Sequence, residues 1–131
     1  MTIWLESREI IHFQKELISE YGGLHGPPKK GMLESTLARP QNLCAYDRNA
    51  SVFQLAASYG YGFARNHCFP DANKRIALTS ISVFLLLNGY ELRASETDVV
   101  VTIRSIADGG MTEDQLSRWI EENSISRTGH R

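Results

Sequence analysis

The apolar residues of the chain recur mainly at the three- and four-residue spacing of helices that bury one face. Helix start signals support this pattern, because Ser51, Ser95 and Thr112 each stand where a hydroxyl opens a capping box. The spacing predicts helices over residues 7–21, 32–38, 51–66, 73–88, 97–107 and 113–123. The predicted fold is therefore an all-α, compact helical bundle of one domain.

The helix predicted over residues 73–88 is apolar on nearly all sides, with side chains such as Ile76, Ile81, Leu86 and Leu87. A helix of this composition has to be covered by other helices on most of its faces. We therefore expect it at the centre of the bundle. On the outer helices, the residues expected to face the core are Ile10, Ile11, Phe13, Leu17, Ile18, Val99, Val101, Ile103, Ile106, Leu116, Trp119 and Ile120.

Breaks in the helical pattern predict the loops and the end of the domain. Residues 24–31 are rich in glycine and proline and predict an exposed loop or short β-hairpin, either a flap over a site or a solvated connector. Pro40 predicts the end of helix 32–38, because the residue before a proline is pushed away from helical geometry. The folded domain is expected to span residues 1–124, and the polar residues 125–131 to form a flexible tail.

Composition excludes several classes of function. The 131 residues have a formal net charge of −1, so the chain lacks the basic field that attracts nucleic acids regardless of sequence. No apolar stretch approaches the roughly 20 residues of a membrane span, and residues 1–6 lack the features of a signal peptide. Cys44 and Cys68 do not have the spacing of a zinc site or a disulfide framework. We expect a cytoplasmic protein that binds neither membranes nor nucleic acids directly.

Most of the candidate chemistry lies in residues 67–75, His-Cys-Phe-Pro-Asp-Ala-Asn-Lys-Arg, which lead into the apolar helix. The N-terminus of a helix offers free backbone N–H groups and the positive end of the helix dipole, and together these bind anions. Lys74 and Arg75 fall in the first turn, where a cation is unfavourable unless an anion compensates it. This conflict predicts a phosphate ligand.

The other residues of this segment suit a reaction at a phosphate. Asp71 is a candidate Mg²⁺ ligand, because Mg²⁺ binds one or two carboxylates together with phosphate oxygens and water. His67 is the candidate general base, since imidazole exchanges protons near neutral pH. Asn73 is expected to cap the helix, and Phe69 to anchor the loop in the core. Taken singly, these side chains are more often caps, packing residues or solvated charges, and their occurrence together favours a site.

The pattern His67-x-Phe69-x-Asp71-Ala72-Asn73-Lys74-Arg75 resembles the signature of the Fic/Doc family at every fixed position. The resemblance extends upstream through residues 31–41 and downstream to residues 88–90, so it covers most of the chain. It implies a helical Fic/Doc fold with a small flap. It also implies that His67 is the base, Asp71 the metal-associated carboxylate and Phe69 the structural anchor. The phosphate-binding residues implied by the resemblance are Ala72, Asn73, Lys74 and Arg75.

Two positions favour the Doc, or death-on-curing, branch of this family. Lys74 stands where Fic enzymes have a second glycine, and Leu78 where they have a second arginine. The branch implies a toxin that transfers the γ-phosphate of ATP, bound with Mg²⁺, to a hydroxyl of a protein. By resemblance the target is a threonine of elongation factor Tu, so that translation is inhibited. The resemblance further implies a Phd-like antitoxin, whose amphipathic helix lies in a groove of the bundle.

Two other functions remain open at this point. Attack at the α-phosphorus would make the protein a nucleotidyltransferase of the Fic type. Without catalysis, the same fold would serve as a helical interaction module. A thiol beside a base also raises the hypothesis of a cysteine nucleophile, but Cys68 occupies a variable position of the signature and is expected to be a spectator.

Overall fold

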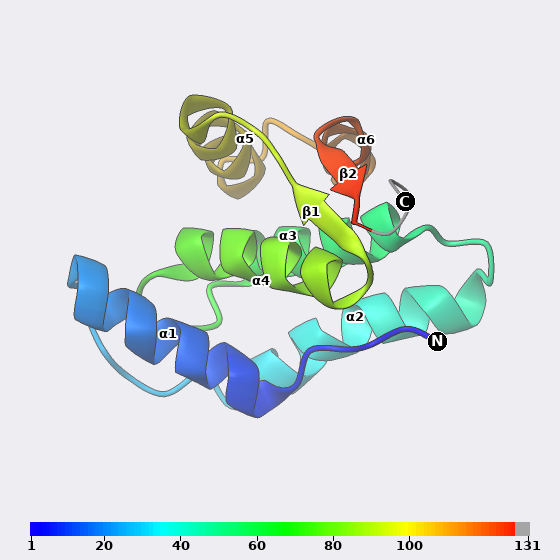
Figure 1. The fold of residues 1–131 in the computed structure, drawn as a ribbon. Helices are drawn as coiled ribbons and strands as arrows, with labels where there is room; N and C mark the ends of the chain where they lie inside the picture. Colours follow the sequence, from blue (N-terminus) through cyan, green and yellow to red (C-terminus); the bar gives the residue numbers. More distant parts are fainter. Residues whose placement is uncertain (128–131) are drawn as a thin grey trace.

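The computed structural model describes residues 1–127, which contain six helices and one small sheet (Figure 1). The all-α fold predicted from the apolar spacing is confirmed. Every helix within these residues is too short or too polar to cross a membrane. In chain order the elements are α1 (Ser7–Tyr21), α2 (Met32–Tyr46), α3 (Val52–Asn66), α4 (Asn73–Leu87), β1 (Tyr90–Leu92), α5 (Glu96–Ala107), α6 (Glu113–Glu122) and β2 (Ser124–Ser126).

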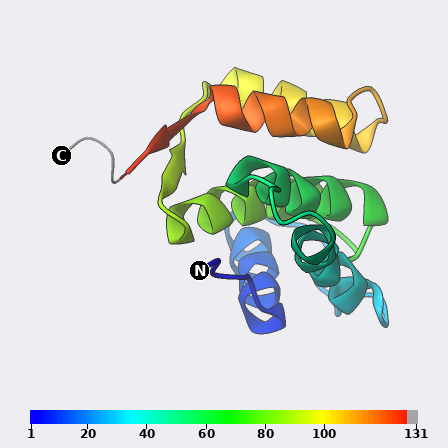
Figure 2. The same cartoon turned by 90° about the vertical axis from the view of Figure 1, so that its right-hand side faces the viewer.

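The helices form three layers (Figure 2). α3 and α4 lie side by side in the middle layer, with α5 and α6 on one side and α1 and α2 on the other. α3 has more buried residues than α4, because it packs against α2, α4, α5 and α6. α4 is central, as its composition predicts, but it shares the centre with α3.

Small residues on α3 allow the middle helices to approach closely. A Cβ atom at Gly60 would overlap the Ile81 side chain of α4. A Cβ atom at Gly62 would lie 2.9 Å from Cγ2 of Thr36 on α2. A glycine inside a helix costs about 1 kcal/mol relative to alanine. The close contacts explain why α3 nevertheless contains two of them.

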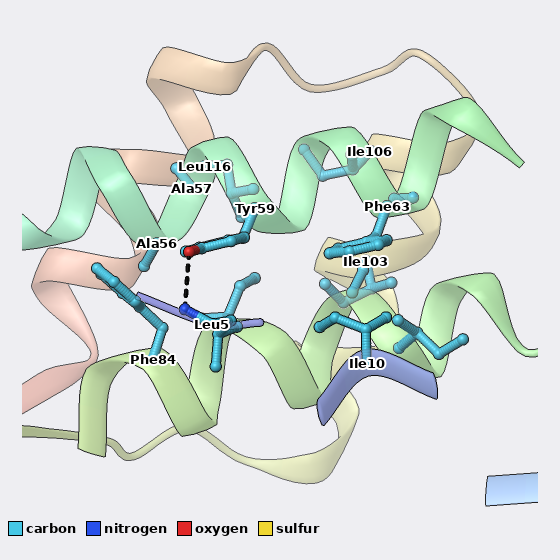
Figure 3. Close-up of a cluster of buried hydrophobic side chains, with 14 of the residues drawn as sticks. Leu5, Ile10, Ala56, Ala57, Tyr59, Phe63, Phe84, Ile103, Ile106 and Leu116 are labelled. Carbon is cyan, nitrogen blue, oxygen red and sulfur yellow. Dashed lines mark hydrogen bonds between the residues drawn. The ribbon is translucent and has the colours of Figure 1, made fainter. Parts of the chain in front are cut away.

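A buried tyrosine ties the N-terminal segment to the core (Figure 3). The hydroxyl oxygen of Tyr59 accepts a hydrogen bond from the backbone N–H of Leu5 at 3.0 Å, and its ring lies 5.1 Å from that of Phe84. All three residues are buried, and burial raises the pKa of Tyr59 to about 12. The hydroxyl therefore stays protonated, while its oxygen satisfies a backbone donor that would otherwise be unpaired.

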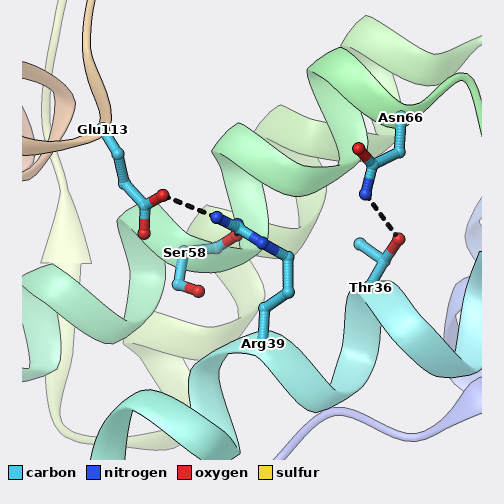
Figure 4. A network of polar contacts seen from close by, with 5 residues as sticks. All are labelled: Thr36, Arg39, Ser58, Asn66 and Glu113. Carbon is cyan, nitrogen blue, oxygen red and sulfur yellow. Dashed lines mark hydrogen bonds and ion pairs between the residues drawn. The ribbon is translucent and has the colours of Figure 1, made fainter.

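The end predicted for the second helix at Pro40 is wrong, because α2 continues to Tyr46 with Pro40 inside it. A proline removes one backbone donor and crowds the preceding turn. Packing outweighs this cost, since Pro40 is buried and α2 packs mainly against α3. A polar network links α2 to both α3 and α6 (Figure 4), in which Arg39 donates to the Ser58 carbonyl of α3 at 2.6 Å and to Glu113 of α6 at 2.7 Å.

Some apolar residues predicted to be inward lie on the surface. Ile11 is 44% exposed and Val101 is 59% exposed. On α4 the residues near the C-terminal end, Leu86 and Leu87, are also exposed. The helical spacing identifies an apolar stripe but not its width, and the neighbouring helices cover only part of it.

The strands lie elsewhere than the sequence suggests. Residues 24–31 form a mostly exposed loop without strand structure, which confirms the loop and not the hairpin of the two predicted alternatives. Instead β1 and β2 pair antiparallel, with Glu91 opposite Ile125. Part of the predicted polar tail, through Ser126, is therefore a paired strand, and residues 128–131 lie outside the described part of the chain.

Candidate functional site

The segment between α3 and α4 borders a pocket of about 430 Å³. One wall comes from the motif and the first turns of α4, and the opposite wall from α5. All the motif residues predicted to act on a ligand line this pocket: His67, Asp71, Ala72, Asn73, Lys74 and Arg75. The structure thus brings the predicted site residues together around one space.

Two residues in left-handed backbone conformation delimit the motif loop. His67 ends α3 with a φ of 48°, and Ala72 precedes α4 with a φ of 70°. Residues other than glycine rarely adopt this conformation, and where they do, the backbone is often held at a functional site. The turn at His67 leaves its imidazole exposed at the rim of the pocket.

Asn73 holds the loop closed. Its side-chain oxygen accepts a hydrogen bond from the Phe69 N–H at 3.0 Å, and its side-chain nitrogen donates to the Phe69 carbonyl at 2.9 Å. The expected capping role of Asn73 is wrong, because the N-cap is Ala72, which has no side-chain acceptor. Since no side chain caps α4, its first backbone N–H groups are available to an anion.

Phe69 and Cys68 lie beneath the loop rather than in the pocket. Phe69 is 3% exposed and belongs to the core, as expected of an anchor. Cys68 is buried as well, and this burial raises the pKa of its thiol to about 11. The thiolate is the reactive form of cysteine, so a buried and protonated Cys68 does not suit a nucleophile.

Both oxygens of the Asp71 carboxylate accept backbone hydrogen bonds. Oδ1 accepts from the Ala72 N–H at 2.8 Å, and Oδ2 accepts from the Leu24 N–H at 3.0 Å. The bond from Leu24, followed by the bond from Ala72, lowers the pKa of Asp71, because a hydrogen-bond donor favours the charged form. Asp71 is therefore an exposed anion with a fixed orientation.

The donor set of the site suits Mg²⁺ only when a phosphate ligand is present. Within residues 1–127 no group of three His, Cys, Asp or Glu side chains is placed to hold a metal ion. Asp71 alone offers one carboxylate, and Mg²⁺ commonly combines one or two carboxylates with phosphate oxygens and water. The residues fit Mg²⁺ bound together with a nucleotide, and not a dedicated protein metal centre.

The two cations of the motif are exposed and face the pocket. Lys74 and Arg75 lie in the first turn of α4, with no acidic residue beside them in that turn. The guanidinium carbon of Arg75 lies 4.3 Å from the centre of the Tyr21 ring at the end of α1. The positive charges and the free N–H groups together make this wall of the pocket attractive to phosphate.

Sequence reasoning missed the wall that α5 provides. Val99, Val100, Ile103, Arg104 and Ala107 line the pocket opposite the motif. Their helical spacing was recognisable, but it indicated only a face that packs on the core. Apart from Arg104 this wall is apolar, so the pocket suits a ligand that has an anionic part and an apolar part.

Comparisons with known proteins agree with the motif. The model of the Fic/DOC family matches residues 4–85. The chain is 39% identical over 88 residues to the "Protein kinase doc" of Escherichia phage P1, covering 67% of this chain and 70% of that protein. It is 37% identical over 65 residues to the "Toxin Doc" of Mycolicibacterium smegmatis, covering 49% of this chain and 50% of that protein. The chain belongs to the Fic/Doc family, on its Doc branch.

Proposed function

We propose that this protein is the toxin of a toxin–antitoxin pair and that it transfers the γ-phosphate of ATP to a hydroxyl of a protein target. The observation that supports this most directly is the pocket, in which the motif supplies a cationic wall and α5 a mainly apolar wall. A nucleotide has both an anionic chain and an apolar base, and it needs such a pocket. One Doc relative is named a protein kinase, which supports the proposed activity, and the other is named a toxin, which supports the proposed biological role.

The residues have distinct tasks in this reaction. The target hydroxyl attacks the γ-phosphorus, its proton passes to His67, and the bond to the departing ADP breaks with its electron pair. Lys74, Arg75 and the free N–H groups of α4 bind phosphate oxygens and stabilise the negative charge that develops on them. Asp71 would hold Mg²⁺, which supplies further charge neutralisation when it is bound. Asn73 keeps the loop in the shape that this arrangement needs.

The biological setting follows from the same proposal. A threonine of elongation factor Tu is the proposed target, so that phosphorylation inhibits translation in the cytoplasm. A Phd-like antitoxin is the proposed partner, with an amphipathic helix that lies in a groove of the bundle. The proposed target and the proposed antitoxin are both inferred from the resemblance to Doc toxins.

Labelled ATP separates the proposed reaction from its rivals. Incubation with elongation factor Tu and Mg²⁺ should transfer label from γ-labelled ATP and none from α-labelled ATP. Transfer of the α label instead would mean nucleotidyl transfer, and the kinase proposal would be wrong. If ATP with Mg²⁺ neither binds nor raises the melting temperature, and His67→Ala leaves toxicity unchanged, the protein is a non-catalytic interaction module.

A further inference from the structure

Residues 21–24, which include the end of α1 and the turn after it, touch two of the motif residues. Tyr21, the last residue of α1, places its ring against the guanidinium of Arg75 at 4.3 Å. Three residues later, the backbone N–H of Leu24 donates to Oδ2 of Asp71 at 3.0 Å. Asp71 and Leu24 are 47 positions apart in sequence, so tertiary packing brings the segment onto the motif.

Gly22 and Gly23 form the turn that aims the Leu24 N–H at the carboxylate. Both have positive φ angles, of 79° and 124°, which other residues rarely adopt. A Cβ atom on Gly23 would lie 2.8 Å from Oδ2 of Asp71 and 3.0 Å from Cδ1 of Ile18, whereas one on Gly22 would meet nothing within 4 Å. A side chain at position 23 would therefore push the carboxylate away, and one at position 22 would not.

Both contacts leave the functional atoms free. The guanidinium carbon of Arg75 lies over the Tyr21 ring, and a cation–π contact of this kind needs no hydrogen bond from the guanidinium N–H groups, which remain able to bind phosphate. A carboxylate oxygen that accepts one hydrogen bond retains a second lone pair for another partner. The segment thus fixes the orientation of Arg75 and Asp71 without competing for their ligands.

We propose that residues 21–24 are a positioning element for the nucleotide site, in which Tyr21 orients Arg75 toward phosphate and the Gly23–Leu24 turn orients Asp71 toward Mg²⁺. This inference rests on the proposed function. It assigns to the end of α1 a role that its sequence does not suggest, since Tyr21 and the two glycines otherwise only end a helix. A side chain ordered before binding loses less entropy when the ligand arrives, and this raises affinity.

Variants at Tyr21 test the first contact by calorimetry of the full chain. Tyr21→Ala should weaken the binding of ATP with Mg²⁺ by about two- to fivefold, the effect expected of one exposed cation–π contact. Tyr21→Phe keeps the ring face and should bind like the wild type, whereas Tyr21→Leu keeps only the bulk and should resemble Tyr21→Ala. In the transfer assay, KM for ATP should rise in Tyr21→Ala while kcat stays unchanged, a split that a loss of folding would not produce.

Variants at the two glycines test the second contact. Affinity for ATP is measured once with Mg²⁺ and once with EDTA, and the ratio of the two gives the gain in ATP affinity that Mg²⁺ provides. Gly23→Ala should reduce this gain by about tenfold, the usual effect of disturbing a residue that orients a metal ligand. Gly22→Ala is the matched control, because it has the same type of backbone strain without the contact to Asp71.

The outcomes distinguish this inference from the function on which it rests. Equal losses in the two glycine variants, or unchanged or tighter ATP binding by Tyr21→Ala, would overturn the positioning role while the nucleotide site stands. A wild-type protein that binds ATP in neither condition would overturn both proposals. Thermal unfolding of each variant shows whether it is folded, and the Tyr21 variants still decide the matter if Gly23→Ala does not fold.

Discussion

Helices α6 and α4 begin in opposite ways. α6 starts with a capping box, in which the hydroxyl of Thr112 accepts from the Gln115 N–H at 3.1 Å and the Gln115 side chain accepts from the Thr112 N–H at 2.9 Å. Glu113 and Asp114 follow in its first turn, where the helix dipole favours negative charge. Each of these features stabilises the helix without any ligand.

α4 starts with none of these features. Its N-cap is Ala72, in a left-handed conformation and without a side-chain cap. Lys74 and Arg75 occupy the first turn, where the dipole disfavours positive charge. An anion bound there would offset both defects. The start of α6 thus stabilises its own helix, whereas the start of α4 gives up stability and leaves N–H groups free, as the proposed nucleotide site requires.

The largest effect expected at the start of α4 is on the reaction itself. His67→Ala should lower phosphate transfer by about 10²- to 10⁴-fold, because His67 is the proposed general base and a positioned base contributes a factor of this size. ATP affinity, measured by calorimetry, should change little, since the imidazole lies at the rim of the pocket and carries no phosphate-binding role. If His67→Ala lost ATP affinity but kept phosphate transfer, His67 would be a phosphate-binding residue and not the general base.

Removing the charge of Lys74 is expected to change ATP affinity and protein stability in opposite directions. Lys74→Ala should weaken ATP binding roughly tenfold, as expected for one charge-assisted hydrogen bond to phosphate. Without nucleotide, the same variant should be slightly more stable, because relief of the conflict with the dipole outweighs the lost attraction between Lys74 and the exposed Asp71 carboxylate. Calorimetry and urea denaturation measure the two effects. Arg118→Ala on α6 is the control, and it should leave ATP affinity unchanged.

Arg104 on α5 provides a cation in the opposite electrostatic setting. It lines the pocket, but it lies in the last turn of its helix, where the dipole favours positive charge. Arg104→Ala should therefore weaken ATP binding by about threefold to tenfold and also lower stability slightly. A stability gain like that of Lys74→Ala would contradict the role given to the dipole, and unchanged affinity would remove Arg104 from the site.

The same contrast explains what the sequence could predict. The starts of α3 and α6 were predictable, because a capping box involves residues three positions apart. The motif was predictable for the same reason, since its residues are consecutive. The N-cap of α4 was mistaken because Ala72 takes a conformation that the closed loop imposes, and no local signal shows this.

Features that depend on tertiary packing were missed or wrong. The local rule for Pro40 failed because the packing of α2 on α3 outweighs one lost hydrogen bond. The contribution of α5 to the pocket depends on how that helix crosses the start of α4, which the spacing of Val99, Ile103 and Ala107 does not reveal. Pairing of β1 with the C-terminal residues was invisible for the same reason.

Stability variants test the two helix starts directly. Thr112→Ala removes the cap of α6 and should cost about 1 kcal/mol with no effect on ATP binding. Ala72→Gly should instead raise the free energy of unfolding by a few tenths to about 1 kcal/mol, because glycine adopts the left-handed conformation without strain. Urea denaturation of both variants provides the measurement. A loss of stability in Ala72→Gly would show that Ala72 is not strained.

The smallest expected effect depends on pH and concerns Asp71. Backbone N–H groups hold the pKa of its carboxyl below the ordinary value of 3.8, so the bonds favour folding while the carboxylate is charged. This contribution is present above pH 3.8 and is lost as the pH falls below it through the lowered pKa. Wild type should therefore be slightly more stable than Asp71→Asn at pH 7.

Denaturation midpoints at pH 7 and at pH 3 test the expected trend. The difference between wild type and Asp71→Asn should shrink at the lower pH, because below pH 3.8 the Asp71 carboxyl of the unfolded chain takes up a proton before that of the folded chain does. A constant difference would mean that the two backbone bonds act equally on the charged and neutral forms. In that case the Asp71 carboxylate would be oriented by geometry alone. The electrostatic difference between the two helix starts would then come only from their first turns, which hold Lys74 and Arg75 on α4 and acidic residues on α6.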